Sequence, residues 1–265
     1  MIKNFVSRRL TLTFAFGLIL AVGLNGVAAA AEITVMISGA FTPVYNKVKD
    51  DFAKQTGHTL IYVSGPSMGA TPQAIPNRLA RGEVADVVIM ARSALDSLVE
   101  KKLAVAGSQT DLVHSSIAIA VKQGAPKPDI STPEAVKKAL LNAKSIGYSD
   151  SASGVYVSTQ MFKNLGIEKE MAVKAKKVEA TPVGESVAEG KFEIGFQQLS
   201  ELMPVHGIDI VGLLPEKIQL VTVFSAGMSA NAKSPEAGKA LIAYLASPKA
   251  YAAIEASGLK PASKK

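Results

Sequence analysis

Short runs of apolar, often β-branched residues alternate with amphipathic stretches along most of this chain. The run Val87–Met90 has no polar alternation, which is typical of a parallel strand covered on both faces. In the stretch that follows the apolar run at residues 33–37, Val44, Val48 and Phe52 recur at helical spacing and share one face of a predicted helix. This alternation of strands and helices predicts an α/β fold with mainly parallel sheets.

The first 31 residues have the layout of a secretory signal peptide. Basic residues come first, an apolar stretch covers about residues 10–27, and small residues follow it. We expect cleavage near Ala30 or Ala31 and export of the remaining chain to the periplasm. Removing the three basic residues of this segment lowers the formal net charge from +7 to +4, so no nucleic-acid partner is expected.

The remaining 234 residues suit two lobes of roughly 115 residues each. We expect one lobe at residues 32–115 plus 224–265 and the other at 116–223. Two apolar segments, 116–121 and 220–224, are expected to cross between them.

Strands are expected at residues 33–37, 60–63, 86–90, 117–121, 145–148, 193–196 and 208–212. Helices are expected at residues 42–55, 93–101, 133–141, 154–165, 184–189, 235–247 and 248–257.

Reactive side chains are scarce in this sequence. It has no Cys and only His58, His114 and His206, which lie far apart, so no metal site is expected. The Gly-x-x-x-x-Gly-Lys-Ser/Thr loop that cradles phosphates is absent from the sequence, and no cofactor is expected. Residues 65–69 have the Gly-x-Ser-x-Gly spacing of a nucleophile elbow, which leaves a serine hydrolase using Ser67 as an alternative.

Three polar, glycine-containing turns follow predicted strands, at residues 38–42, 64–69 and 149–156. Strand ends and helix N-termini offer free backbone N–H groups to an anion, and serine hydroxyls add neutral donors. Ligands of open α/β sheets sit beside such turns. Ordinary helix capping explains any one of these turns, but the three together favour an anion site.

Three longer side chains can join such a site. Arg92 follows the strand at 86–90, and its guanidinium favours a carboxylate or phosphate. Gln197 and Gln198 end the strand at 193–196 and offer amide donors on the other lobe.

Seven short segments keep a characteristic order and spacing across the chain. They are residues 79–89, 153–156, 193–196, 212–219, 224–227, 247–250 and 258–261. In this order they resemble periplasmic molybdate-binding proteins of ABC importers over essentially the whole mature chain. The resemblance implies a type II periplasmic-binding fold, in which two α/β lobes joined by two crossing strands close on a ligand by hinge motion.

The resemblance also implies a set of neutral donors for an oxyanion. Ser67 matches the serine of the family's second turn, and the adjacent Met68 is expected to line the ligand site with it. Ser153 and Gly154 match the amides that open a helix, and Val183 matches a further amide donor.

Two positions depart from the family pattern. The serine of its first turn falls on Ala40, with Ser38 two residues earlier, and its tyrosine falls on Gln197 or Gln198. These departures leave a small organic acid, anchored by Arg92, as an alternative ligand.

The sequence therefore predicts a monomeric periplasmic solute-binding protein that delivers molybdate, tungstate or a similar oxyanion to the membrane subunits of an ABC importer. It is expected to perform no chemistry. The organic-acid carrier and the periplasmic serine hydrolase remain the alternatives.

Overall fold

The structure is a computed structural model that describes residues 30–179 and 181–263, together with Met1. The predicted signal peptide falls almost wholly on residues 2–29, outside the described residues, and stays a prediction.

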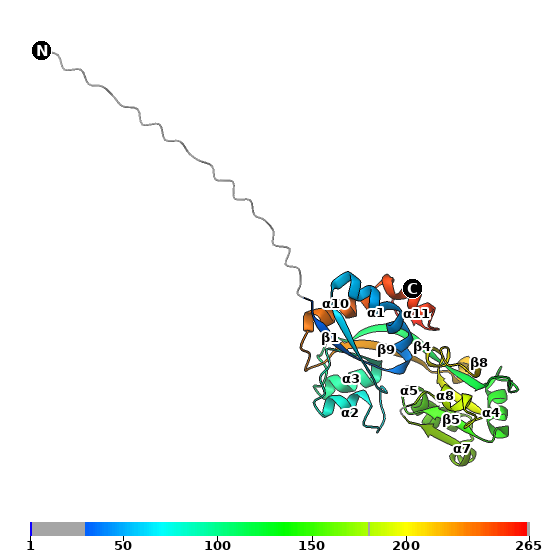
Figure 1. The fold of residues 1–265 in the computed structure, drawn as a ribbon. Coiled ribbons are helices and arrows are strands. Elements are labelled where there is room, and N and C mark those ends of the chain that lie inside the picture. Colours follow the sequence, from blue (N-terminus) through cyan, green and yellow to red (C-terminus); the bar gives the residue numbers. More distant parts are fainter. Residues whose placement is uncertain (2–29, 180, 264–265) are drawn as a thin grey trace.

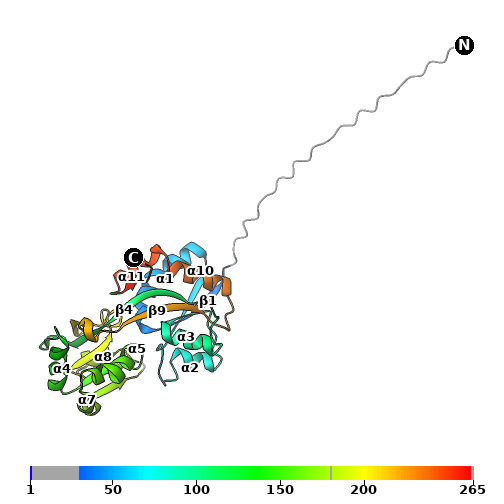
Figure 2. The same ribbon diagram turned by 180° about the vertical axis from the view of Figure 1, so that it is seen from behind.

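The first lobe is built on three parallel strands in the order β2-β1-β3. They are β1 (Glu32–Ile37), β2 (Thr59–Ser64) and β3 (Val87–Ala91). Its helices are η1 (Gly39–Phe41, a 3₁₀ helix), α1 (Thr42–Thr56), α2 (Ile75–Ala80), α3 (Arg92–Glu100), α10 (Pro235–Leu245), η4 (Pro248–Ala250, also 3₁₀) and α11 (Tyr251–Glu255). Helices α1, α10 and α11 cover one face of the sheet, and α2 and α3 cover the other (Figure 1 and Figure 2).

Two long strands join the lobes. β4 (Thr110–Lys122) pairs with β9 (Val221–Met228) up to Ser116, and from Ile117 onward it pairs with strands of the second lobe. β9 also pairs with β3, so the strand order is β2-β1-β3-β9-β4-β7-β5-β6. The crossing strands predicted from the sequence are therefore present, and their pairings are antiparallel.

The second lobe repeats the parallel arrangement with β7-β5-β6. Its strands are β5 (Ile146–Ser149), β6 (Ala175–Val178), β7 (Ile194–Gln198) and β8 (Ile208–Leu213), the last antiparallel to β4. Its helices are α4 (Pro133–Asn142), α5 (Ala152–Tyr156), η2 (Val157–Met161, a π-helix), α6 (Phe162–Asn164), α7 (Glu168–Lys174), α8 (Val183–Ala188), α9 (Leu199–Leu202) and η3 (Glu216–Ile218, 3₁₀). A short β10 (Lys260–Pro261) pairs with β4 in the first lobe.

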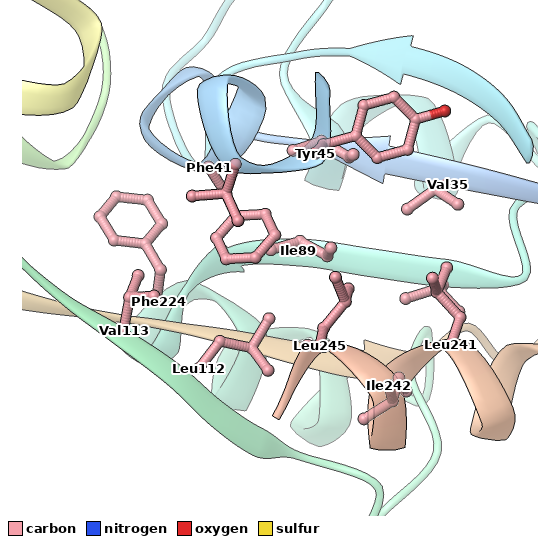
Figure 3. Packing of buried hydrophobic residues seen from close by; sticks show 14 of the residues in the cluster. Val35, Phe41, Tyr45, Ile89, Leu112, Val113, Phe224, Leu241, Ile242 and Leu245 are labelled. Carbon is pink, nitrogen blue, oxygen red and sulfur yellow. The ribbon is translucent and has the colours of Figure 1, made fainter. Parts of the chain in front are cut away.

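Successive side chains of β1 and β3 enter different cores. Val35 and Ile89 pack with α1 and α10, whereas Met36 and Val88 pack with α2 and α3. Because side chains alternate along a strand, a sheet covered on both faces needs apolar residues at every position. The uninterrupted apolar run of β3 is therefore explained. Figure 3 shows the larger core, which includes Phe41, Tyr45, Leu112, Phe224, Leu241 and Leu245.

A separate core fills the second lobe between β5, β7 and the helices α4 to α7. The two-lobed α/β fold expected from the sequence is thus confirmed. The residue ranges predicted for the lobes, 32–115 plus 224–265 and 116–223, stay a prediction.

One buried carboxylate ties the first lobe together. Asp86, 2% exposed, precedes β3 and accepts three backbone hydrogen bonds. Its Oδ2 accepts from Thr34 N (2.7 Å), and its Oδ1 accepts from Lys233 N (2.7 Å) and Ser234 N (2.6 Å). It thereby fixes β1, the start of β3 and the entry to α10 relative to one another.

The predicted elements differ from the observed ones mainly where elements are short. The helices α2, α7 and α9 and the strand β6 were not predicted. Residues 154–165, expected to form one regular helix, contain the π-helical turn η2.

Within the described residues, no helix combines the length and the apolar character that crossing a membrane requires.

Candidate functional site

A cavity of about 100 Å³ lies between the two lobes, at the carboxyl ends of their strands. The first lobe contributes residues 38–39 after β1 and residues 64–66 at the end of β2. The second lobe contributes residues 149–151 after β5, residues 181–182, and the side chains of Gln197 and Glu201. This is the edge of an α/β sheet where ligands are expected to bind.

A cavity of about 400 Å³ adjoins the site and also draws on both lobes, whereas two larger cavities draw on one lobe each. One of about 720 Å³ lies between the segment after α3 and helix α10, and one of about 520 Å³ lies beside α4 and β7. Both are lined mainly by apolar surface. The cavity between the lobes is the candidate site because residues of both lobes converge there.

The two lobes touch beside this cavity. Ser67 N, in the loop after β2, donates to Ser151 Oγ, in the loop after β5 (3.1 Å). In the same loop Gly69 has φ +114°, and a Cβ there would lie 2.8 Å from the backbone oxygen of Asp150. A larger residue at Gly69 would therefore hold the two loops apart.

The amide of Gln197 has a fixed orientation in this site. Its Oε1 accepts from Val183 N (2.8 Å) and Gly184 N (3.4 Å), at the start of α8. Its Nε2 must then point the other way, and it donates to Glu201 Oε1 (3.0 Å). Gln197 therefore connects the start of α8 to the carboxyl group of Glu201 at the cavity.

Burial raises the pKa of Glu201 to about 7. The hydrogen bond from Gln197 acts against this shift, the negative charge of Asp150 adds to it, and a backbone hydrogen bond from Gln198 opposes it. At neutral pH the carboxyl group is therefore present in both its protonated and its ionised forms. Such a group can both accept and donate a proton.

Asp150 adds a second carboxyl group to the cavity lining, and the other lining residues are neutral. Hydroxyl groups come from Ser38, Ser64, Ser149, Ser151 and Thr181. No Lys, Arg or His is among the described residues that line it. In the described part of the chain, no three His, Cys, Asp or Glu side chains gather as metal ligands would.

The predicted ligand-binding residues fall into two groups. Ser38 and Gln197 line the cavity, whereas the remaining eight do not. Those eight are Ala40, Ser67, Met68, Arg92, Ser153, Gly154, Val183 and Gln198.

Most of these eight are committed to packing or to local hydrogen bonds. Ala40 lies in the larger core of the first lobe, and Met68 packs against it. Ser153 Oγ and Ser149 Oγ share a hydrogen bond of 2.9 Å, and Gly154 N donates to Ser149 Oγ (3.1 Å). These bonds shape the turn after β5 from inside.

Ser67 is fully buried, and its Oγ accepts a hydrogen bond from Ala91 N (2.9 Å). A nucleophile must be reachable by its substrate, so this geometry does not support a hydrolase using Ser67. The hydroxyl instead fixes the loop after β2 to the end of β3.

Gln198 lies at the junction of the two crossing strands. Its Oε1 accepts from Ser115 Oγ on β4 (2.8 Å), and its Nε2 donates to Thr222 Oγ1 on β9 (3.3 Å). Adjacent residues of a strand point to opposite faces, so only one of Gln197 and Gln198 can face the cavity.

Arg92 is engaged on the surface of the first lobe. Its Nε contacts Asp96 Oδ1 (2.8 Å) and its Nη1 contacts Asp111 Oδ1 (2.7 Å). These two carboxylates raise its pKa further. The guanidinium is therefore already paired.

Sequence reasoning missed Glu201, whereas Gly39 and Asp150 lie within the predicted turns 38–42 and 149–156 without having been singled out. Glu201 follows Gln197 by four residues, in a helix of only four residues that has no pattern of its own. The available signal was an acidic residue in the first turn after a strand end, which on its own resembles ordinary helix capping.

Two α/β lobes that share two crossing strands and enclose a donor-lined cavity define a two-lobed ligand-binding protein. The chain belongs to the bacterial extracellular solute-binding protein family, whose model matches residues 33–260.

Its relatives include both a binding protein and an enzyme. It is 49% identical to the aconitate isomerase of a Pseudomonas species over 251 residues, which are 94% of this chain and 96% of that protein. It is 30% identical over 251 residues to the molybdate-binding protein ModA of Azotobacter vinelandii, covering 90% of this chain and 94% of that one. The solved structure of the periplasmic molybdate-binding protein of A. vinelandii superposes with a TM-score of 0.68 at 21% identity, covering 86% of this chain and 98% of that one. The predicted kinship with periplasmic molybdate-binding proteins is thus confirmed.

The relative named aconitate isomerase contradicts the expectation that this chain performs no chemistry. That expectation rested on the scarcity of thiols, histidines and usable serine nucleophiles. It left out reactions that need only one carboxyl group of suitable pKa, and Glu201 is such a group.

Proposed function

We propose that this protein is an isomerase that binds aconitate, a small unsaturated tricarboxylate, between its lobes and moves its carbon–carbon double bond. The observation that carries the proposal is the 49% identity to an aconitate isomerase over 94% of the chain. The predicted signal peptide and the family support a periplasmic location for this enzyme.

The isomerisation of aconitate can proceed in a site that has few reactive side chains. Its three-carbon skeleton carries a carboxylate on each carbon, with one CH₂ group next to the double bond. Removing a proton from that CH₂ gives a carbanion delocalised over both terminal carbons of the skeleton. Adding a proton to the other terminal carbon completes the shift of the double bond. The step requires a proton acceptor and donor but no cofactor.

The site supports this chemistry at two points. Hydroxyl donors such as Ser38 and Ser64 can hold carboxylates without a fixed positive charge. Glu201, with a pKa of about 7, exchanges protons at neutral pH.

The second candidate function is the one expected from the sequence. A monomeric carrier would deliver molybdate or tungstate to the membrane subunits of an ABC importer. It is favoured by the 30% identity to a molybdate-binding protein and by a cavity of about 100 Å³ with neutral donors.

The purified chain, without added metal, is expected to convert cis-aconitate and trans-aconitate to the same mixture, because a catalyst approaches one equilibrium from both sides. Proton NMR of the vinyl and methylene signals measures both directions. Calorimetric titration with molybdate, tungstate and sulfate runs in parallel. Tight binding of molybdate without any interconversion would replace the isomerase by the carrier.

Replacing Arg92 with alanine is expected to change the affinity for trans-aconitate by no more than about twofold, as for a surface residue outside the site. Its guanidinium is occupied by Asp96 and Asp111 and does not line the cavity. Calorimetry of the variant checks this, with Arg81→Ala as a matched arginine on the same lobe. A tenfold loss confined to the Arg92 variant would instead make Arg92 the anchor of the organic acid.

A further inference from the structure

We infer that Glu201 is the catalytic residue that removes and returns the proton during this isomerisation, and that Gln197 is the positioning residue that aims its carboxyl group. This inference rests on the proposed function. It assigns a role to two residues of the site and follows from their geometry.

Glu201 lies at the boundary between the lobes. It belongs to α9 of the second lobe, directly after β7, and its carboxyl group packs against Gly39 in η1 of the first lobe. A Cβ at Gly39 would clash with Glu201 Oε1. The glycine therefore leaves the space that lets the carboxyl group reach across the boundary.

The carboxyl group borders two cavities. Besides the site of about 100 Å³, Glu201 lines an adjoining cavity of about 400 Å³, and the two share Gly39, Ser64 and Pro182. The adjoining cavity also has Lys47 in its lining. A substrate with three carboxylates can therefore place one end among neutral donors and another towards a cation, with its central carbons beside Glu201.

Gln197 determines where that carboxyl group points. Its amide cannot turn over without losing the hydrogen bonds from Val183 N and Gly184 N. The donor directed at Glu201 is thus held by the backbone of α8, and it stabilises the ionised form of the carboxyl group, which is the form that accepts a proton.

The proton transfer balances without a further reactant. The carboxylate of Glu201 takes a proton from the CH₂ carbon, and the released electron pair forms a new double bond to the central carbon. The former π pair moves to the outer carbon and is delocalised into its carboxylate. Glu201 then returns the proton to that outer carbon, which restores the enzyme.

The charged groups around Glu201 set its pH response. Asp150 raises its pKa, Lys47 and Tyr62 line the adjoining cavity together with it, and Glu185 on α8 is exposed to solvent. Because the base must be ionised, kcat/KM is expected to rise with pH through about 7 and then to level off.

The decisive variant is Glu201→Gln, which keeps the shape of the side chain but cannot carry a proton. It is expected to lose about 10²–10⁴-fold in interconversion and in exchange of substrate hydrogen with D₂O, while its Kd for trans-aconitate stays within about threefold. Glu185→Gln, a change of an exposed carboxyl group, is the control and is expected to match the wild type. Glu201→Asp keeps a carboxyl group and is expected to retain the pH dependence at a lower rate.

Gln197→Met tests the positioning role. Without the amide donor the pKa of Glu201 rises, so the midpoint of the kcat/KM profile is expected to move above 7. A merely structural role would lower the rate and leave the midpoint in place, which overturns this part of the inference.

The outcomes separate the inference from the proposed function. A wild-type protein that neither interconverts aconitate nor exchanges its hydrogens overturns both. An active wild type with a Glu201→Gln variant above one tenth of its rate overturns the inference alone. If Glu201→Gln does not fold, the Glu201→Asp variant and the wild-type profile decide, and a profile that is flat between pH 6 and 8 overturns the inference.

Discussion

Replacing Asp86 with alanine lowers the free energy of unfolding by an expected 3–5 kcal/mol, about the cost of leaving charge-assisted hydrogen bonds unmade. The carboxylate accepts from the backbone of Thr34, Lys233 and Ser234, and it is 2% exposed. Alanine leaves three donors without an acceptor in a place where water enters only partly. These donors belong to segments that lie almost 200 residues apart, so the loss loosens β1, β3 and α10 together.

Urea unfolding followed by far-UV circular dichroism measures this change. Asp86→Asn is expected to fall between the wild type and alanine, because its amide retains one acceptor oxygen. Asp50→Ala, at an exposed position of α1, is the control and is expected to stay within about 0.5 kcal/mol of the wild type. An Asp86→Ala variant as stable as that control would show that the three bonds contribute nothing net.

The second large effect is expected at Gly39 and concerns activity rather than stability. In Gly39→Ala the new methyl group clashes with the Glu201 carboxyl group, which is expected to turn away because it is the end of a flexible side chain. A misplaced acid–base group is expected to cost about 100-fold in kcat/KM for aconitate. The melting temperature should change little, since Gly39 does not have the positive φ that only glycine tolerates well.

A double-mutant cycle with Glu201→Ala checks this explanation. Once Glu201 is shortened, the methyl group at position 39 has room, so Gly39→Ala should bring no further loss of activity or of trans-aconitate affinity. Additive losses in the double variant would mean that the glycine acts through something other than Glu201.

The parts of the fold that are regular over several residues could be predicted from the sequence. β3 and α1 carry clear apolar patterns, because each packs along its whole length. The first part of β4, residues 110–115, was not recognised, since it contains Thr110, Asp111 and His114 and is held by pairing with β9 rather than by its own pattern. β6 could not be predicted for a similar reason, because it is an edge strand that exposes Lys176 and Lys177.

The candidate site was only partly predictable. The turns after β1, β2 and β5 were identified because strand ends meet at one edge of a sheet, and all three border the cavity. Which of their side chains face it depends on hydrogen bonds between distant segments, as with Ser67 and Ala91. Glu201 gains its proton affinity from burial between the lobes, which no local pattern encodes.

The path of β4 and β9 also governs the order in which this chain can fold. The larger core combines Val35 near one end of the chain with Phe224 and Leu259 near the other, and Val113 faces Phe224 across the crossing strands. All residues between Val113 and Phe224 must be synthesised before the core can close. Bringing such distant segments together carries an entropic cost and slows folding. A nascent chain that ends before β9 therefore lacks α10 and α11 and leaves the face of β1 and β3 that they share with α1 only partly covered. The lobe that begins first is thus the last to be completed.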